Sequence, residues 1–206
     1  MSLNAISVPP LNGSEPQHLL IALHGWGANA QDLTFLASMF ELPDFQFIFP
    51  DAPFSHPQVP GGRAWYDLGT QNGPGLEESR ERLFQWIVSL EKTTGVPLEK
   101  TILSGFSQGG AMTLDVGLNF GLPLARLCSL SGYLHFQPQK SEVPTPPVLI
   151  VHGRDDLVVP VTAAQTAQKE LKDIGVKVVY REFEMGHEIT PPVLALMQRF
   201  MLGLGA

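Results

Sequence analysis

Residues 101–114 read Thr-Ile-Leu-Ser-Gly-Phe-Ser-Gln-Gly-Gly-Ala-Met-Thr-Leu. The apolar start predicts a strand over 101–104, and the stretch from Gly110 predicts a helix. Between them, 105–109 match the pattern G-x-S-x-G, in which a serine stands on a sharp turn from strand to helix. Such a turn crowds the backbone, so small residues are needed two positions before and two after the serine. The segment therefore predicts a strand–turn–helix unit with a nucleophilic Ser107 at its tip.

A pattern this short arises by chance in about one such chain in ten, so the rest of the chain has to support it. Short apolar runs, most of them without polar alternation, predict strands at 19–23, 45–49, 101–104, 127–130, 148–151 and 176–180. Amphipathic stretches predict helices at 76–93, from a capping box at 162–165 to Gly175, and at 191–202. This alternation is typical of an α/β fold with a mostly parallel central sheet flanked by helices.

Composition limits both the architecture and the class of partner. The 206 residues are 44% apolar and 16% charged, which predicts a single domain over 1–206 with a large core and excludes a disordered chain. Thirteen Lys and Arg against twenty Asp and Glu leave a net charge of −7. An acidic chain without a basic stripe is not expected to bind nucleic acid, because phosphate neutralisation needs clustered cations.

The chain shows no sign of export or of membrane insertion. Residues 1–10 lack a basic segment followed by an apolar run, and the longest apolar runs are far shorter than the ~20 residues of a transmembrane helix. A lone cysteine, Cys128, excludes an internal disulfide and suits a reducing compartment. A cytoplasmic location is therefore expected. The oligomeric state stays open, with a homodimer as one alternative.

A serine hydroxyl attacks poorly unless a base removes its proton, so the pattern requires a histidine and an orienting carboxylate. After Ser107, the chain offers His135, His152 and His187. His187 follows a glycine between the last predicted strand and the last predicted helix, which favours it as the base. His152 ends a strand and is interpreted as fixing the turn by hydrogen bonding, and His135 as a surface or satisfied core residue.

The carboxylate is expected from the segment after His152, which contains Asp155 and Asp156. The resulting chain order Ser, Asp, His is the order that this elbow architecture uses. Consecutive side chains point apart, so only one of the two aspartates can orient His187. Chemistry alone leaves the choice between them open.

The oxyanion of a tetrahedral intermediate needs hydrogen-bond donors. In this architecture one donor is the N–H of the residue after the nucleophile, here Gln108, and another comes from an early strand–helix loop. That loop is 23–29, Leu-His-Gly-Trp-Gly-Ala-Asn, in which Trp26 would donate its N–H and His24 would shape the loop.

Two loops rich in Pro and Gly, 53–75 and 132–147, each follow a predicted strand. Ligands of parallel α/β sheets bind beyond the carboxyl ends of the strands, so both loops are expected at that edge. Large aromatic residues in such a loop favour a role in lining a cleft. Trp65 and Tyr66 are therefore predicted to bind substrate.

With these residues in place, the chain from 19 to about 202 resembles the α/β-hydrolase superfamily. It is most similar to the bacterial carboxylesterase/lysophospholipase group related to acyl-protein thioesterases. The motifs that carry the resemblance are Leu-His-Gly-x-Gly at 23–27, Trp-Tyr-Asp at 65–67, Gly-Phe-Ser-Gln-Gly-Gly at 105–110, His-Gly-x-x-Asp-x-Val-Val-Pro at 152–160 and Gly-His at 186–187.

The resemblance implies Asp156 as the acid, because it is the fourth residue after the histidine of the fourth motif. It also implies an oxyanion hole from the N–H groups of Trp26 and Gln108, no metal and no organic cofactor. The segment before the first strong strand looks short, with an opening strand near 5–8. No long insertion follows 127–130, which predicts a minimal form without a cap domain and with an open, shallow cleft.

Together these features predict a serine carboxylesterase that hydrolyses a small-molecule acyl ester, or another acylated substrate, through a Ser107–His187–Asp156 triad and an acyl-enzyme. An acyl-protein or acyl-CoA thioesterase and a lysophospholipase are alternatives on the same triad. A non-catalytic scaffold is disfavoured because every catalytic position holds a competent residue. A metallohydrolase using His152 and Asp155 is disfavoured because the sequence has neither H-E-x-x-H nor a Cys/His cluster.

Overall fold

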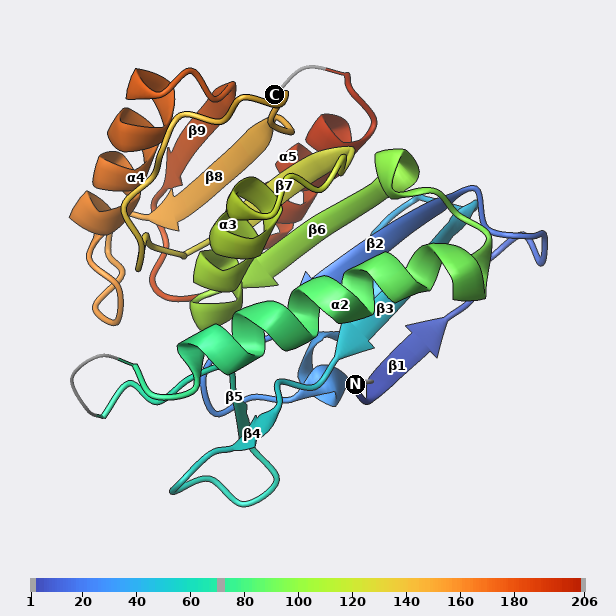
Figure 1. Cartoon of the computed structure of the whole chain (residues 1–206), viewed down its shortest axis with the longest axis horizontal. Coiled ribbons are helices and arrows are strands. Elements are labelled where there is room, and N and C mark those ends of the chain that lie inside the picture. The colour runs from blue at the N-terminus through green and yellow to red at the C-terminus, as the bar shows by residue number, and fades with distance from the viewer. Residues whose placement is uncertain (1–2, 70–72, 205–206) are drawn as a thin grey trace.

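The computed structural model describes residues 3–69 and 73–204, and a seven-stranded sheet forms its centre (Figure 1). In spatial order the strands are β1 (Ala5–Val8), β3 (Phe45–Pro50), β2 (His18–Leu23), β6 (Thr101–Phe106), β7 (Arg126–Leu130), β8 (Val148–Gly153) and β9 (Val178–Phe183). β1 runs antiparallel to β3, and the other pairs of neighbours in this sheet are parallel. The predicted mostly parallel sheet, with a short opening strand at 5–8, is confirmed.

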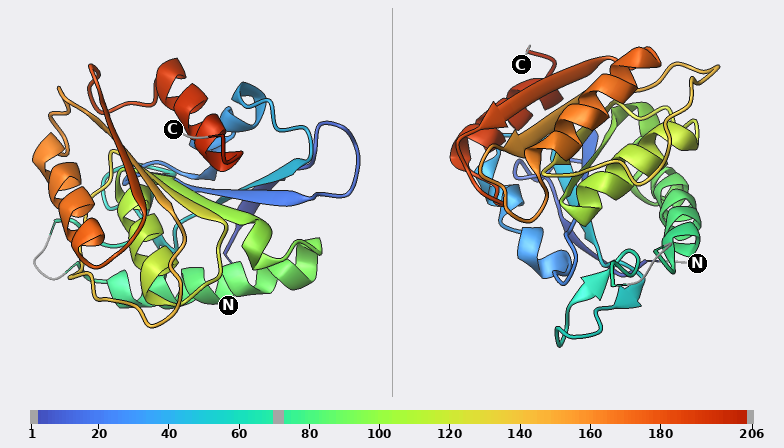
Figure 2. Two further views of the ribbon diagram at one scale, coloured as in Figure 1. Left: turned by 90° about the horizontal axis from the view of Figure 1, so that it is seen from above. Right: turned by 90° about the vertical axis from the view of Figure 1, so that its left-hand side faces the viewer.

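Helices cover both faces of the sheet (Figure 2). One face carries α2 (Leu76–Thr94), α3 (Gln108–Asn119) and α4 (Val161–Asp173), and the other carries α5 (Pro191–Met201), α1 (Leu36–Met39) and the 3₁₀ turn η1 (Ala30–Leu33). A second 3₁₀ turn, η2 (Leu98–Lys100), leads into β6, and a two-stranded hairpin, β4 (Phe54–Ser55) with β5 (Arg63–Ala64), lies outside the main sheet. In the described part of the chain, no helix is long and apolar enough to cross a membrane.

The strands are apolar along their whole length because both of their faces are covered. In β2, Leu19, Ile21 and Leu23 pack in the core cluster under α2, α3 and α4, whereas Leu20 and Ala22 pack in the cluster under α1 and α5. Successive strand residues point to opposite faces, so a strand buried on both sides needs an uninterrupted apolar run. The unbroken runs of the sequence are thus explained by two cores, one on each face.

The predicted start of α4 and the predicted bounds of β9 differ from the structure, and other predicted elements differ by one or two residues at their ends. The helix begins at Val161, directly after Pro160, without a side-chain cap, so the predicted capping box at 162–165 is wrong. Gly175, with φ +92°, ends the helix as expected, but the chain then turns once more and Val176 donates its N–H to the carbonyl of Leu171. This delays the last strand, which runs over 178–183 and not 176–180.

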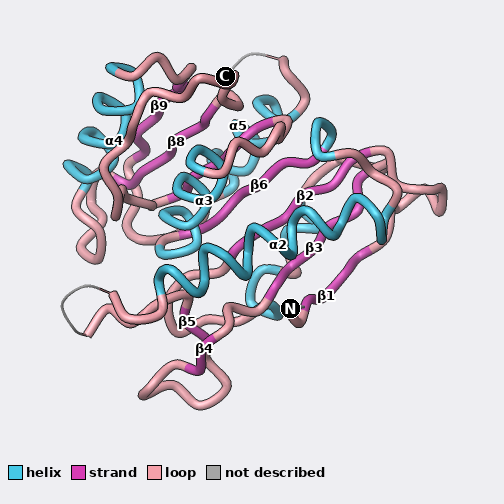
Figure 3. The backbone as a smooth tube through the Cα atoms, in the orientation of Figure 1, coloured by secondary structure: helices cyan, strands magenta, loops and turns pink. Residues whose placement is uncertain are grey.

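The loops at the carboxyl ends of the strands gather at one edge of the sheet (Figure 3). They include 24–29 after β2, the loop after β3 up to α2, 131–147 after β7, 154–160 after β8 and 184–190 after β9. Both loops rich in Pro and Gly lie at this edge, as predicted, although residues 70–72 of the first are outside the described residues. Residues 131–147 contain no helix, so no helical cap is built there.

Candidate active site

Ser107 lies at the tip of the turn between β6 and α3, in a backbone conformation that few residues adopt. Its φ of 56° and ψ of −119° fall in a sparsely populated region. Its N–H donates to the carbonyl of Leu130 on the neighbouring strand β7, at 2.8 Å. The predicted strand–turn–helix unit around Ser107 is therefore confirmed.

The glycines that flank Ser107 are needed because the turn brings backbones together. A Cβ on Gly105 would lie 2.2 Å from the carbonyl oxygen of Gly109, and a Cβ on Gly109 would lie 2.2 Å from the carbonyl oxygen of Leu23. Both distances are far below van der Waals contact, and both obstacles are backbone atoms. The two outer positions of the G-x-S-x-G pattern are thus required by packing.

His187 and Asp156 form a hydrogen-bonded pair at the same edge of the sheet. The distance from His187 Nδ1 to Asp156 Oδ2 is 2.7 Å. A carboxylate can only accept, so the imidazole donates through Nδ1–H and its Nε2 lone pair is left to accept a proton. The ring of Phe106 lies 4.7 Å from the His187 ring, centroid to centroid, and packs beside it.

Backbone donors hold the other oxygen of Asp156. Oδ1 accepts from the N–H groups of Val158 and Val159, at 2.9 Å and 2.8 Å. Burial by itself would raise the pKa of this carboxyl, but the hydrogen bonds from His187, Val159 and Val158 outweigh it, and the pKa lies below its ordinary value. Asp156 is thus a fixed negative charge against Nδ1 of His187.

The neighbouring Asp155 does not compete for His187. Asp155 is exposed, and its backbone N–H donates to the carbonyl of Met185 at 3.1 Å. The structure therefore pairs His187 with the aspartate that the family resemblance implied, a choice that chemistry had left open.

His152 closes the loop that carries Asp156. It is buried at the end of β8, and its Nε2 lies 2.8 Å from the carbonyl oxygen of Val159 and 3.4 Å from Asp156 Oδ2. Both neighbours are acceptors, so Nε2 carries the proton. This agrees with the interpretation of His152 as a residue that fixes the turn.

A pocket of about 830 Å³ contains both Ser107 and His187 in its wall. Most of the remaining wall is apolar. It comes from η1, the end of β6, the loops after β2, β7, β8 and β9, the loop before α2 and the start of α4. The lining residues are Gly25, Trp26, Ala28, Asp32, Leu33, Phe35, Leu68, Phe106, Ser107, Tyr133, Leu134, Val158, Val159, Pro160, Ala163, His187 and Ile189. The pocket offers a hydroxyl and an imidazole within a largely apolar surface.

The loop after β2 lies directly against Ser107. A Cβ on Gly25 would be 3.3 Å from Ser107 Cβ. The N–H groups of Gly27 and Ala28 donate to the carbonyls of Arg63 and Gly25, whereas within the described residues the Trp26 N–H has no such partner. Gln108 is the first residue of α3, where an N–H has no partner inside the helix. Both predicted oxyanion donors therefore have N–H groups without a partner in the backbone.

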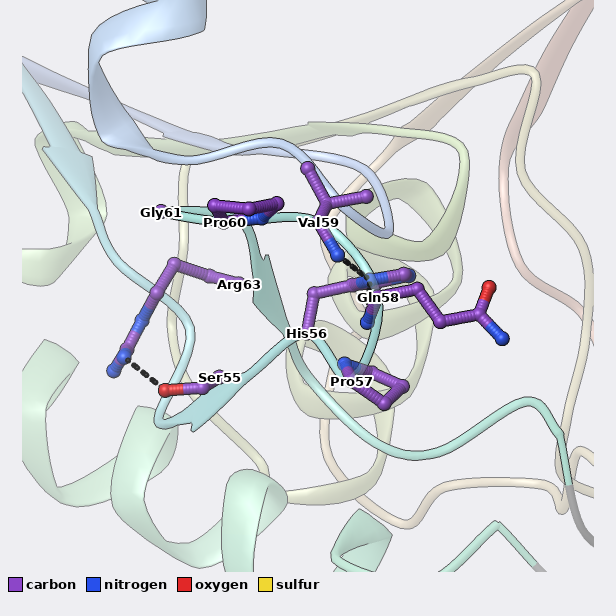
Figure 4. Close-up of a pocket in the computed structure, with 9 residues that line it drawn as sticks. Ser55, His56, Pro57, Gln58, Val59, Pro60, Gly61 and Arg63 are labelled. Atoms are coloured by element: carbon purple, nitrogen blue, oxygen red, sulfur yellow. Dashed lines mark hydrogen bonds between the residues drawn. The ribbon is translucent and has the colours of Figure 1, made fainter.

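The β4–β5 hairpin supports this loop from the outside (Figure 4). Besides accepting from Gly27, Arg63 donates its N–H to the carbonyl of Ala28 at 2.8 Å. Within the hairpin loop, which encloses a smaller pocket of about 370 Å³, the Val59 N–H donates to His56 Nδ1. The His56 ring meets the Trp26 ring edge-on at 4.2 Å. The hairpin therefore restrains the loop that carries the Trp26 N–H.

Trp65 and Tyr66 do not line the pocket, which corrects the prediction that they line a cleft. Trp65 is completely buried, and its Nε1–H donates to the carbonyl of His24 at 2.9 Å. The side chain of Gln108 accepts from the Trp65 N–H and donates to the Tyr66 carbonyl, at 3.0 Å and 2.8 Å. Burial of a large aromatic side chain is strongly stabilising, and here both residues pack behind the turn that carries Ser107 instead of facing the pocket.

Several pocket residues were missed in the sequence. Tyr133 and Leu134 follow β7, in a loop that was expected at this edge, and Val158 and Pro160 follow β8, in the segment that was expected to supply the carboxylate. An aromatic residue three positions after the end of a buried strand was the available signal for Tyr133.

No group of three or more His, Cys, Asp or Glu side chains that could hold a metal ion occurs within residues 3–69 and 73–204. His152 and Asp155, the pair considered for a metallohydrolase, do not belong to such a group. Cys128, in β7, is buried, and burial raises the pKa of its thiol, so it behaves as a small apolar residue of the core.

A serine on a strained strand-to-helix turn, a His–Asp pair beyond later strands and a mostly parallel sheet covered on both faces define the α/β-hydrolase class. The family model for phospholipases and carboxylesterases matches residues 10–203. The chain belongs to this family, and it is a serine hydrolase.

Individual proteins agree with this assignment. Acyl-protein thioesterase 1 of Gibberella zeae is 28% identical over 204 residues, covering 86% of this chain and 83% of that protein. The crystal structure of esterase PE8 superposes with a TM-score of 0.90 at 30% identity, over 98% of this chain and 99% of that one. The carboxylesterase SOBER1 of Arabidopsis thaliana superposes with a TM-score of 0.78 at 27% identity, over 90% of this chain and 98% of that one.

Proposed function

We propose that this chain, acting as one domain over 1–206, hydrolyses carboxylic esters of small acyl compounds with Ser107, His187 and Asp156 as its triad. The observation that carries the proposal is the His187–Asp156 hydrogen bond of 2.7 Å beside the pocket that Ser107 and His187 share. A base oriented by a carboxylate, next to a serine on a strained turn, is the arrangement that acyl transfer to a hydroxyl requires.

The reaction proceeds in two halves. Ser107 Oγ attacks the ester carbonyl carbon while His187 Nε2 takes its proton, and the tetrahedral intermediate then collapses as His187 gives that proton to the leaving alkoxide. A water molecule, deprotonated by His187, then attacks the carbonyl carbon of the acyl-enzyme. As this second tetrahedral intermediate collapses, His187 returns the proton to Ser107 Oγ, and the acid and the free serine are released. Asp156 does not exchange a proton, but its charge stabilises the imidazolium that forms twice.

The intermediate's negative oxygen is stabilised by the backbone N–H groups of Trp26 and Gln108. The close approach of Gly25 to Ser107 and the lack of a backbone partner for both N–H groups support this role. The N-terminal end of α3 adds a positive dipole at the same place. Each such donor contributes roughly 10²–10³ in rate.

The apolar wall of the pocket favours an acyl ester over a charged substrate. Relatives named acyl-protein thioesterase make hydrolysis of thioesters the second candidate, because the same triad would cleave either bond. The lining by Leu33, Phe35, Leu134 and Val158 provides the apolar contact for the acyl group.

A matched series tests the choice between these two functions. We expect p-nitrophenyl esters with acyl chains of two to eight carbons to be hydrolysed at a higher kcat/KM than acyl thioesters with the same chains. The measurement is initial-rate kinetics, with the Ser107→Ala protein as the blank. A thioester preference of tenfold or more at every chain length would replace the esterase proposal with the thioesterase one.

The two adjacent aspartates supply an internal control for the triad. Asp156→Asn is expected to lower kcat roughly 10⁴-fold, because an amide at this position stabilises the wrong imidazole tautomer and removes the charge that faces Nδ1. Asp155→Asn, at an exposed side chain that does not contact His187, is expected to keep kcat within about twofold. Equal losses in both variants would refute the assignment of Asp156.

A further inference from the structure

Four polar side chains form a continuous hydrogen-bonded chain behind one wall of the pocket. The Tyr133 and Tyr66 hydroxyl oxygens are 2.6 Å apart, and the Tyr66 hydroxyl lies 2.9 Å from His135 Nδ1. His135 Nε2 lies 2.7 Å from Asp115 Oδ2. The four residues come from α3 and from the loops after β3 and β7, and none of them belongs to the proposed triad. We call them the tyrosine–histidine chain.

The buried end of the tyrosine–histidine chain sets the direction of its hydrogen bonds. The Asp115 side chain is 1% exposed, and Arg80 Nε lies 3.1 Å from its Oδ2. Asn119 Nδ2 donates to its other oxygen at 2.7 Å. Arg80 also pairs with Glu77, but the Glu77 side chain is 83% exposed, so water solvates its charge and Arg80 remains the counter-charge of the buried Asp115. We therefore assign a neutral imidazole to His135, with its proton on Nε2 toward Asp115.

This tautomer determines every further donor. Nδ1 of a neutral His135 protonated on Nε2 can only accept, so Tyr66 donates its single proton to Nδ1. Tyr66 therefore accepts at its oxygen from the Tyr133 hydroxyl. The proton of Tyr133 is thus committed to Tyr66, and its oxygen keeps a lone pair for a further donor.

Both phenols keep the protons that this pattern needs. Burial is the main cause that raises the pKa of Tyr66, and the adjacent Tyr133 raises it further. Burial also raises the pKa of Tyr133, against a smaller opposite effect of the hydrogen bond with Tyr66. Neither group ionises near neutral pH, so the direction of the tyrosine–histidine chain is stable there.

Tyr133 is the member of the tyrosine–histidine chain that lines the pocket with Ser107 and His187. Tyr66 is 4% exposed and lies behind it. The neighbouring wall residues, Leu134 and Val158, offer no hydrogen bond from their side chains. On the side of the pocket formed by the loops after β7 and β8, Tyr133 is therefore a directional polar group in an apolar wall.

We propose that Tyr133 is a specificity-determining residue, whose hydroxyl oxygen accepts a hydrogen bond from a hydroxyl or amide N–H of the substrate close to the scissile ester. The inference rests on the proposed function, since it assigns a substrate feature to the same pocket. A substrate with an ether at that place would set two acceptors against each other, and a pure hydrocarbon would leave the Tyr133 lone pair without a partner.

Two pairs of substrates that differ by one methyl group test the proposal. One pair, 2-hydroxyethyl and 2-methoxyethyl butanoate, varies the leaving group, and the other, p-nitrophenyl 3-hydroxybutanoate and 3-methoxybutanoate, varies the acyl group. The measured quantity is the hydroxyl-to-methoxy ratio of kcat/KM in the wild type divided by the same ratio in Tyr133→Phe. Dividing by the variant's ratio removes the steric effect of the methyl group.

We expect this quotient to be about 5- to 20-fold for at least one pair, as the loss of one hydrogen bond in a binding site predicts. Quotients within twofold of unity for both pairs would overturn the proposal. A general structural defect would lower both substrates together and leave the ratio unchanged.

The direction of the hydrogen bonds has its own test in Tyr66→Phe. Without the Tyr66 hydroxyl, the Tyr133 O–H is free to donate to the methoxy oxygen of the substrate. The hydroxyl-to-methoxy ratio of kcat/KM should therefore fall at least threefold relative to the wild type. An unchanged ratio would show that Tyr133 does not donate to Tyr66, and the proposed role of Tyr133 as an acceptor would be wrong.

Labelling of Ser107 by a fluorophosphonate, followed by mass spectrometry, separates this inference from the proposed function. A wild-type protein that is labelled and active, with quotients within twofold of unity for both pairs, would refute the role of Tyr133 and leave the esterase in place. A wild-type protein that is neither labelled nor active on any ester would refute both.

Discussion

Replacement of Ser107 by alanine is expected to lower kcat toward the best ester substrate by about 10⁴–10⁶-fold. Alanine removes the only oxygen that can form the acyl-enzyme, so the remaining rate must come from attack by water. This variant keeps the substrate-binding surface and the N–H groups of Trp26 and Gln108. Because these can still accelerate attack by water, they set the lower bound on the residual activity. The measurement is single-turnover and steady-state kinetics at matched protein concentration.

A second serine gives the control for this prediction. Ser89 lies on the exposed face of α2, away from the pocket, and Ser89→Ala should retain full activity. A fluorophosphonate should add one adduct to the wild type and to Ser89→Ala, and none to Ser107→Ala. A folded Ser107→Ala protein with more than a tenth of the wild-type kcat would contradict the role of this serine.

Replacement of Gly109 by alanine, a single added methyl group beside Ser107, is expected to be strongly destabilising. The added Cβ would lie 2.2 Å from the carbonyl oxygen of Leu23 and 2.6 Å from that of His24. These are backbone atoms of the last residue of the central strand β2 and of the residue that follows it, so no side-chain rotation relieves the overlap. We expect the free energy of unfolding to fall by about 4 kcal/mol or more, the range reached only by severe overpacking or strain.

Chemical denaturation at equilibrium measures this loss, and for a chain of this size it corresponds to a fall in Tm of about 10 °C or more. Gly186→Ala is the matched control, because its Cβ would meet nothing nearer than the carbonyl oxygen of Asp155 at 4.0 Å. We expect the control to change stability by less than about 1 kcal/mol. A Gly109→Ala protein as stable as this control would refute the packing argument.

The local patterns of the sequence predicted most of the fold. Unbroken apolar runs such as 19–23 and 148–151 identified strands buried on both sides, because period-two alternation disappears when both faces are covered. The end of the sheet was harder to predict. Val176 is apolar, but the helix before it ends with an extra turn at Gly175, so the apolar run and the strand do not coincide.

The sequence predicted those members of the candidate site whose chemical role allows only a few residue types. Ser107 was found through its flanking glycines, and His187 through its place after the last predicted strand. Asp156 was separable from Asp155 only through the family resemblance, since both carboxylates have the same chemistry. The hydrogen bond to His187 in the structure distinguishes them, because it depends on where the loop after β8 turns.

Trp65 shows the limit of reasoning from residue type. An aromatic residue in a loop can line a pocket or pack beneath it, and its size favours either place. Its burial followed from contacts with His24 and Gln108, which are 41 and 43 residues away along the chain. No local pattern encodes such a contact.

By itself, the sequence determined the layers of the fold, the turn that carries Ser107 and the types of residue that surround it, because these depend on periodicity, small side chains and short-range sterics. Only the tertiary structure decided which aspartate meets His187, which aromatic residues face the pocket, and that Tyr133 joins a hydrogen-bonded chain ending at Asp115. The physical reason is that a hydrogen bond requires its two atoms to lie within about 3 Å of each other. For residues from separate loops and helices, that distance is decided by the packing of the whole chain.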